Sequence, residues 1–330
     1  MGINFDEAKA ILSLKRSGQT GEDILCLGRP ESFLDIKHLR VLSRAFGLGL
    51  SAAEMERFAR ERFAEPFLSR CGFASIRSLD ASGYEGAEIV HDLNQPLPRA
   101  LHGCTGFLYD GGTGEHVFDV AQTLRNMTLL LRKGGTLLVS SPANGQCGHG
   151  FYQFSPELYY RYFSANGFAG TAVYLVAMLA PSRWFRATDP NALRRRVQFV
   201  TSEAVQGIVV ARKVADLAQA VMPQQSDYSE LQWNASLAET GRAHAGWRTP
   251  AARFRALLRD RVLYPLSVVA RHMLGLTAPG LWRRELFVPV DPLRADLIGA
   301  AQGQSTAGGI EDRIDSTLPP VFNPKIVPRS

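Results

Sequence analysis

The fold is decided by residues 79–142, which read LDASGYEGAEIVHDLNQPLPRALHGCTGFLYDGGTGEHVFDVAQTLRNMTLLLRKGGTLLVSSP. Two apolar, β-rich runs, residues 105–110 and 136–142, flank a segment whose apolar side is spaced as on a helix. The members of that side are Val117, Ala121, Leu124, Thr128 and Leu131. Asp119 lies near the predicted helix start, and residues 132–135 (RKGG) supply the basic and glycine residues of a helix end. A strand, a helix and a strand over this length predict a crossover in a parallel sheet.

Acidic residues stand where consecutive predicted strands end. Asp80 ends residues 75–80, Asp92 follows the run AEIVH, and Asp110 ends TGFLYD. Ligands of open parallel sheets bind at the carboxyl ends of the strands. We therefore expect Asp80 to accept ribose hydroxyls and Asp92 to accept an exocyclic amine. A turn-forming role is the alternative for each, since Asp is common in turns.

Four segments in order resemble consecutive landmarks of the class I S-adenosylmethionine-dependent methyltransferases. They are DLNQPLP (92–98), DGGTGEHV (110–117), LLLRKGGTLLVSSP (129–142) and FSPELYYRYFSANGF (154–168), within a resemblance that covers roughly residues 23–213. It implies a doubly wound, mostly parallel, seven-stranded α/β sheet of the Rossmann-like methyltransferase type. It also implies that S-adenosyl-L-methionine is the cofactor and that the chain is a methyltransferase acting on a small-molecule or glycan-type acceptor. The implied cofactor contacts are Gly28, Arg29, Asp80, Ala81, Asp92, Leu93, Asp110 and Gly111.

The loop after the first predicted strand, DILCL, departs from the family. Cys26 occupies the usual acidic position, and of the expected glycines only Gly28 is present. Pro30 fixes φ and removes a backbone donor, so this loop cannot wrap a ligand in the usual way. Arg29 is a candidate partner for the methionine carboxylate and Glu31 for its ammonium, whereas Glu31 or Ser32 starting a helix is the alternative. The competing class is therefore a binding or scaffold protein that kept the fold.

Candidate acceptor-side residues follow the fourth and fifth strands of the implied sheet. A hydroxyl nucleophile benefits from a base, and His149 and His116 are the two candidates. The resemblance places Tyr152 and Gln153 beside the acceptor. For either histidine a purely structural role is the alternative. The four cysteines are far apart, so their spacing indicates neither a metal site nor a disulfide framework.

Further elements are expected on both sides of this region. Residues 5–16, 32–51 and 52–72 predict helices, with the second and third covering the substrate side or acting as packing filler. Residues 155–157 (SPE) predict a helix start, and residues 166–167 (NG) its end. Residues 170–179 and 205–214 predict strands, the second returning beside the fifth strand. Residues 181–200 are expected as a loop.

The 330 residues carry a net charge of +6, which raises the question of nucleic-acid binding. No reading motif or interleaved aromatic platform accompanies the arginines, so a nucleic-acid partner is not expected. No apolar run reaches the ~18–20 residues of a spanning helix, and a cytoplasmic location is expected. We divide the chain into a methyltransferase-like domain (1–215), a basic helical extension (216–300) and an extended tail (301–330). Packing, homodimerisation and peripheral membrane contact are the open roles of the extension.

Overall fold

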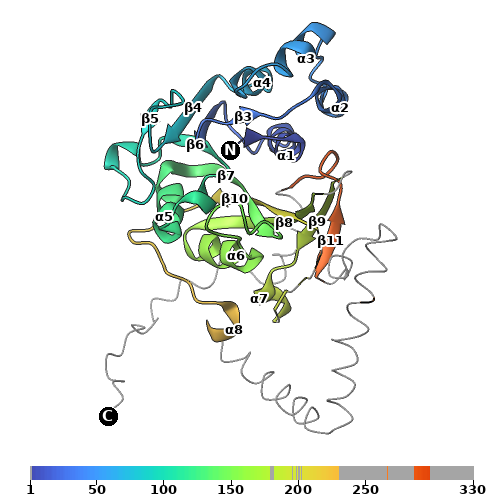
Figure 1. Cartoon of the computed structure of the whole chain (residues 1–330). Helices are drawn as coiled ribbons and strands as arrows, with labels where there is room; N and C mark the ends of the chain where they lie inside the picture. The colour runs from blue at the N-terminus through green and yellow to red at the C-terminus, as the bar shows by residue number, and fades with distance from the viewer. Residues whose placement is uncertain are drawn as a thin grey trace, which may run out of the picture.

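A computed structural model describes residues 2–178, residues 182–229 except 195, 198, 200 and 202, residue 266, and residues 286–297. Its centre is one large twisted sheet with helices on both faces (Figure 1). The parallel strands are β2 (Asp23–Leu27), β4 (Ser75–Asp80), β5 (Ile89–Val90), β6 (Thr105–Gly111) and β7 (Leu131–Asn144). The other strands are β8 (Phe168–Ala177), β9 (Arg183–Ala187), β10 (Val205–Lys213) and β11 (Phe287–Val290).

The strands of this sheet lie in the order β11-β9-β8-β10-β7-β6-β2-β4-β5. Strand β10 pairs antiparallel with both β7 and β8, as expected for a strand that returns beside the fifth one. The pairs β2/β4, β2/β6, β4/β5 and β6/β7 are parallel. The predicted doubly wound, mostly parallel sheet is therefore confirmed, and β9 and β11 extend it beyond the seven expected strands.

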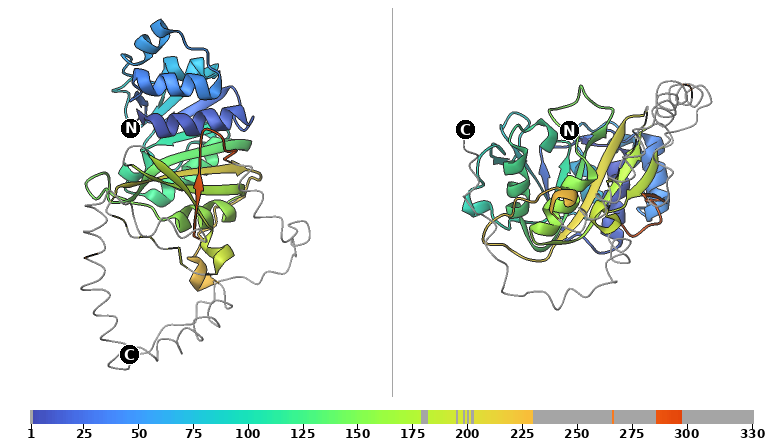
Figure 2. Two further views of the ribbon diagram at one scale, coloured as in Figure 1. Left: turned by 90° about the vertical axis from the view of Figure 1, so that its right-hand side faces the viewer. Right: turned by 90° about the horizontal axis from the view of Figure 1, so that it is seen from below.

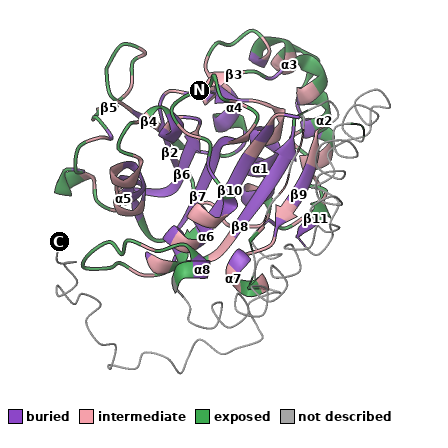
Figure 3. Cartoon of the chain, turned by 60° about the horizontal axis from the view of Figure 1, so that its bottom comes forward, coloured by how far each residue is buried: buried purple, intermediate pink, exposed green. Residues whose placement is uncertain are grey.

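Two hydrophobic cores cover the two faces of the sheet. Helices α1 (Phe5–Arg16), α2 (Ile36–Phe46), α3 (Ala52–Phe58) and α4 (Glu65–Arg70) lie on one face, and α5 (Val120–Leu130) and α6 (Pro156–Ala165) on the other (Figure 2). Strand β2 contributes side chains to both cores. Ile24 and Cys26 pack in the core under α1 to α4, and Leu25 and Leu27 pack in the core under α5 and α6. Successive side chains of a strand point to opposite faces, so a fully apolar strand is buried on both sides. Figure 3 shows the central strands as buried almost throughout.

Side-chain caps explain why two predicted helices are found where expected. The Asn4 side chain accepts the N–H groups of Asp6 and Glu7, and Glu7 accepts the N–H of Asn4, which forms a capping box at the start of α1. Ser155 caps α6 with Pro156 in the first turn, and Asn166 ends that helix. Local chemistry alone thus fixes both boundaries.

The expected bounds and buried face of the helix after β6 were wrong. Val117 ends the 3₁₀ turn η2 (Gly114–His116), and Asp119 caps α5 by accepting the N–H of Gln122, so spacing counted from Val117 does not apply. The buried side chains are Thr123, Leu124, Asn126, Met127 and Leu130. Leu131 begins β7 directly, so the glycines at 134 and 135 lie within that strand rather than ending the helix.

Three further expectations need correction. Residues 52–72 form two helices, because Pro66 has no N–H and belongs in the first turn of a new helix, α4. Glu31 and Ser32 form β3 (Glu31–Ser32), which pairs with β1 (Gly2–Ile3), so neither starts a helix; Asp35 caps α2 instead. The expected loop at 181–200 contains β9 and α7 (Pro190–Leu193).

The proposed extension and tail fall largely outside the described residues. Among the residues of the extension that the structure describes, α8 (Ser226–Ser229) follows β10, and β11 pairs antiparallel with β9 at the edge of the main sheet. The membrane, dimerisation and tail expectations concern residues that the structure does not describe. In the part of the chain that it does describe, no helix has both the length and the apolarity to cross a bilayer.

Candidate functional site

Strand register brings several predicted cofactor residues to one edge of the sheet. Leu27 of β2 lies opposite Leu79 of β4 on one side and Asp110 of β6 on the other. Asp80 lies opposite Val90 of β5. Gly28, Asp80, Asp92 and Gly111 therefore follow the carboxyl ends of four neighbouring strands, the place where ligands of open parallel sheets bind.

The exposed aspartates of this edge are held by their own turns. Asp80 is partly exposed, and its Oδ1 accepts the N–H of Ser82 at 3.1 Å; Ala81 is exposed in the same turn. Oδ1 of Asp92 accepts the N–H and the side-chain amide of Asn94, hydrogen bonds that lower the pKa of this exposed carboxyl group. Leu93, by contrast, is buried.

Asp110 is buried and faces its own loop rather than the other two aspartates. It accepts the N–H groups of Thr113 at 2.7 Å and Gly114 at 3.2 Å, and burial raises its pKa to about 6. Thr113 donates its hydroxyl to the Leu27 carbonyl at 2.6 Å, which ties this loop to the end of β2. A Cβ on Gly111 would lie 2.5 Å from the hydroxyl oxygen of Tyr109, so the position requires glycine.

The loop after β2 is held by charged side chains rather than by glycines. Gly28 has φ 71° and donates its N–H to the Leu79 carbonyl at 2.7 Å. Arg29 donates to Glu65 at 2.6 Å and to the Glu85 carbonyl at 2.7 Å, with its guanidinium over the Phe63 ring. The Arg29 side chain thus connects this loop to the turn that follows β4.

A second arginine strengthens this connection. Arg62 forms ion pairs with Glu31 at 2.8 Å and Glu85 at 2.6 Å. Glu31 is therefore engaged by a cation of the protein itself. Strand β3 occupies the chain positions where the family has its glycine-rich loop. Gly28 and Asp80 stand where the resemblance expects the adenosine half of the cofactor, and the loop expected to meet its methionine half is built differently.

Asn126 is a site-supporting residue that the sequence analysis missed. It is buried on α5, and its Nδ2 donates to the carbonyls of Leu93 at 3.0 Å and Gln95 at 2.9 Å. Its Oδ1 accepts the N–H of Leu97 at 3.2 Å. Three bonds from one side chain fix the loop that carries Asp92 and Leu93. An asparagine between the apolar positions Leu124 and Met127 was the available signal.

The two predicted histidines lie together and share a buried carboxylate. The rings of His116 and His149 are 4.9 Å apart, although they follow different strands. His149 Nε2 lies 3.5 Å from Oε1 of Glu115, whose side chain is 1% exposed. Burial, with a further contribution from Asp110, raises the pKa of Glu115 to about 8. Burial, with the neighbouring His149, lowers the pKa of His116.

A third buried acid, Glu7 of α1, was also missed. Its Oε1 accepts the hydroxyl of Ser140 at 2.7 Å, and Ser140 accepts the side-chain amide of Gln206. Burial raises the pKa of Glu7 to about 7. Glu7 joins α1 to the carboxyl end of β7, so the N-terminal helix covers this edge of the sheet. The capping box signalled the helix start but not this contact.

The expected acceptor contacts support the loop after β7. Tyr152 donates its hydroxyl to the Phe118 carbonyl at 2.7 Å, and Gln153 accepts the N–H of Gln146 at 2.9 Å. Beside them, Phe118 is 72% exposed and Phe151 65% exposed, with their rings edge to face at 5.9 Å. These exposed rings form an apolar surface next to His116 and His149 in the chain.

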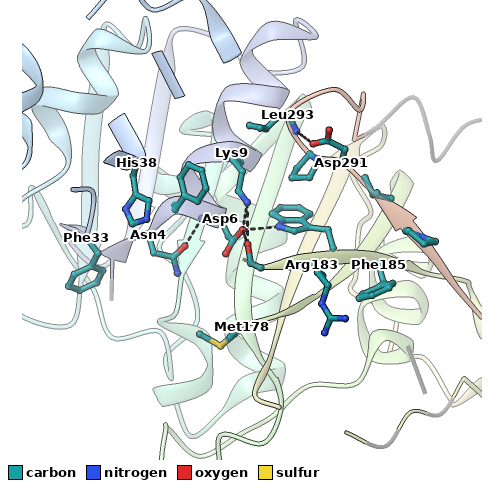
Figure 4. A pocket seen from close by; sticks show the side chains of 16 residues that line it. Asn4, Asp6, Lys9, Phe33, His38, Met178, Arg183, Phe185, Asp291 and Leu293 are labelled. Atoms are coloured by element: carbon teal, nitrogen blue, oxygen red, sulfur yellow. Dashed lines mark hydrogen bonds and ion pairs between the residues drawn. The ribbon is translucent and has the colours of Figure 1, made fainter. Parts of the chain in front are cut away.

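A pocket of about 770 Å³ opens between the start of α1 and β9 (Figure 4). Asp6 contributes a charged group, pairing with Lys9 at 2.5 Å and accepting the Trp184 indole N–H at 2.8 Å. Phe33, which follows β3, and Met178, which follows β8, add apolar surface. The pocket therefore combines an apolar lining with one anchored ion pair.

No family model matches this chain, and no curated protein matches it either. Among solved structures, it is similar to the YcgJ protein of Bacillus subtilis (10% identity, TM-score 0.32, covering 64% of this chain and 99% of that one). It is also similar to a possible histamine N-methyltransferase of Thermotoga maritima (14% identity, TM-score 0.32, covering 63% of this chain and 90% of that one). A third similar structure is the trans-methyltransferase CalH (14% identity, TM-score 0.32, covering 64% of this chain and 58% of that one). The strand order of the chain itself, with β10 antiparallel between β7 and β8, establishes the doubly wound fold that the resemblance to class I methyltransferases implies.

Proposed function

We propose that the protein is an S-adenosylmethionine-dependent methyltransferase acting on a small-molecule or glycan-type acceptor. The observation that carries this proposal is the register that brings Gly28, Asp80 and Gly111 to one edge on adjacent strands. The carboxylate of Asp80, at the end of β4, is suited to accept two ribose hydroxyls. Asp80 is partly exposed there, with Oδ1 engaged by Ser82.

The remaining residues of the edge have roles that follow from their chemistry. Asp92 is exposed and accepts from Asn94, which leaves it near solvent as an acceptor for an exocyclic amine. Leu93, expected as a cofactor contact, is packed in the hydrophobic core beside Asp92. Gly111 offers its backbone at this edge, and the space that a side chain would need there is filled by Tyr109.

The bound cofactor supplies a methyl group on a positively charged sulfur. The protein's own task is to hold the acceptor in line with it, and alignment of this kind contributes about 7–11 kcal/mol to a reaction barrier. His116 has a lowered pKa, so the neutral imidazole that accepts a proton is favoured near pH 7. His149 lies beside it, so either ring is placed to take the proton of a hydroxyl acceptor.

The pocket at α1 and β9 is a separate candidate for an acceptor site, because neither the candidate cofactor residues nor His116 and His149 line it. Its volume of about 770 Å³ is within the ~300–1,000 Å³ typical of small-molecule sites. The Phe33 and Trp184 rings provide flat apolar surface, which sugars and aromatic rings both use, and Lys9 and Asp6 provide polar contacts. This composition suits a molecule with one apolar face and a few hydroxyls.

The loop after β2 favours a second candidate, a binding protein with the same fold. Arg29 and Arg62 both reach Glu85 or its carbonyl, so these side chains close the loop onto the turn after β4. If this network stays closed, it excludes the methionine half of the cofactor. The two candidates differ in one measurable property, the affinity for S-adenosylmethionine.

Calorimetry of the full chain with S-adenosylmethionine and its demethylated product separates the candidates. We expect both to bind, and Asp80→Ala to weaken both by about ten- to a hundredfold, because hydrogen bonds to a charged group contribute about 1.5–3 kcal/mol. Asp216→Ala is the control, since Asp216 follows β10 at the opposite end of the strands; because Asp216 pairs with the buried Lys213 at 2.7 Å, thermal unfolding of this variant is measured alongside. Failure of both ligands to bind at millimolar concentration would establish the binding-protein candidate instead.

A further inference from the structure

Three side chains that follow β6 and β7 bring metal-binding atoms together. A carboxylate oxygen of Glu115 and a ring nitrogen from each of His116 and His149 all lie within 4.8 Å of one another. The pair measured individually, Glu115 Oε1 and His149 Nε2, is 3.5 Å apart. That separation is longer than an ordinary hydrogen bond of ~2.7–3.2 Å.

The same separation is what a shared cation produces. Zinc binds histidine nitrogen and carboxylate oxygen at ~2.0–2.2 Å, so two such ligands of a tetrahedral ion lie ~3.4 Å apart. The Glu115–His149 distance matches this value. Small rotations of exposed histidine side chains suffice to complete the set, since both His116 and His149 are exposed.

The carboxylate of Glu115 is buried without a hydrogen-bond partner among the described residues. Its side chain is 1% exposed, and among the described residues neither of its carboxylate oxygens has a hydrogen-bond partner. Buried polar groups are normally hydrogen-bonded or coordinate a metal, because an unpaired one costs free energy. One of these oxygens, Oε1, lies 3.5 Å from Nε2 of His149.

The two loops that carry the ligands are joined beneath the cluster. Phe151 donates its N–H to the Glu115 carbonyl at 2.8 Å. A Cβ on Gly150 would lie 2.8 Å from that same carbonyl oxygen, so the loops approach as closely as glycine allows. This backbone contact fixes the loop of His149 against that of Glu115 and His116 before any ion binds.

We propose that Glu115, His116 and His149 bind a divalent transition-metal ion of the zinc type. Two nitrogens and one carboxylate oxygen suit Zn²⁺ and its first-row neighbours, whereas Mg²⁺ prefers oxygen ligands. Because both histidines are exposed, the ion keeps coordination positions open to solvent. Phe118 and Phe151, each two residues after one of the histidines, carry exposed rings that contact each other edge to face at 5.9 Å.

The open positions suggest a substrate class, and this step rests on the proposed function. A metal-bound hydroxyl loses its proton more readily, so an acceptor hydroxyl on the ion releases that proton to solvent. The oxygen lone pair then forms the bond to the methyl carbon, and the electrons of the broken carbon–sulfur bond remain on sulfur. His116 and His149 then act as ligands instead of bases. The class is a hydroxyl compound with an apolar face.

Calorimetric titration with ZnCl₂ tests the site on the full chain, without a histidine tag and after treatment with a chelator. We expect one saturable site, weakened about a hundredfold or more in Glu115→Gln, His116→Ala and His149→Ala, since even outer-shell changes cost about 10–100-fold. His102→Ala is the matched control, because His102 is exposed before β6, at the opposite end of that strand. Absence of saturable binding, or equal affinity in all variants, would overturn the proposal.

Two further measurements keep this result separate from folding and from the cofactor. Thermal unfolding of each variant without metal shows whether it folds, and Glu115→Gln keeps the shape of the buried side chain. Visible absorption with Co²⁺ in place of Zn²⁺ reports the coordination number and should change in each ligand variant. Cofactor binding without zinc binding would refute the metal site alone, and zinc binding without cofactor binding would refute the proposed function alone.

Discussion

Replacing Glu7 by Gln should stabilise the protein above neutral pH. Glu7 is 4% exposed, with Oε1 accepting from Ser140 and Oε2 from the N–H of Asn4. Burial is the largest cause of its raised pKa, from 4.5 to about 7, so the folded protein favours the neutral carboxyl group. Glutamine is also neutral: its oxygen can accept from Asn4, but its amide then donates to Ser140, whose hydroxyl loses its acceptor, and this cost is the same at every pH.

The magnitude follows from the shift in pKa. Between pH 4.5 and about 7 the folded protein binds a proton that the unfolded chain has lost, so the free energy of unfolding falls as pH rises. A shift of about 2.5 units at about 1.4 kcal/mol per unit gives a loss of about 3 kcal/mol, complete above the folded pKa. Glu7→Gln does not lose this free energy. Its free energy of unfolding relative to wild type should therefore increase as pH rises from 4.5 to about 7.

Denaturant unfolding of both proteins at about pH 5 and about pH 8.5 measures the difference through the linear dependence on denaturant. Glu54→Gln is the matched control, since Glu54 completes the same kind of capping box on α3 but is partly exposed, and hydrogen bonds from Ser51 lower its pKa. The contribution of Glu54 is lost as pH falls, so its variant should gain nothing at high pH. A Glu7→Gln protein no more stable than wild type at about pH 8.5 would refute the reasoning.

Two further changes test the supports of the site. Gly111→Ala should cost about 1–3 kcal/mol of unfolding free energy, because the new methyl group meets the buried hydroxyl of Tyr109 at 2.5 Å; an unchanged thermal midpoint would contradict this. Asn126→Ala should cost about 1–3 kcal/mol and weaken S-adenosylmethionine binding, since it frees the loop of Asp92 and leaves the Leu93 carbonyl unpaired. Full affinity in a folded Asn126 variant would show that this loop is held by other contacts.

Local chemistry made much of the fold predictable. The ends of α1 and α6 follow from Asn4 and from Ser155–Pro156, whose side chains act on neighbouring residues. The strands before Asp80 and Asp110 follow from continuous apolar runs that turn residues close. The doubly wound sheet and the return of β10 beside β7 follow from the crossover rule and the resemblance, and the structure confirms both, whereas β9 and β11 were not expected in the sheet.

What escaped prediction depends on pairs that are distant in sequence. β1 pairs with β3 across almost 30 residues, which turned an expected helix start at Ser32 into a strand. Glu7 meets Ser140 only because α1 packs against β7, and Glu115 meets His149 only because β6 and β7 end at the same edge of the sheet. The identity of each residue was readable from the sequence, but its partner was not. The cofactor and catalytic residues therefore remain predictions that the experiments above test.

The return of β11 to the sheet has a practical consequence for anyone shortening this protein. A version cut before Phe287 loses the antiparallel partner of β9, and with it the burial of Phe287 and the carbonyl of Leu297 that receives the Tyr174 hydroxyl. The bared backbone of β9 would then offer itself to other molecules as a template for pairing. We expect such a fragment to aggregate more readily than the full chain.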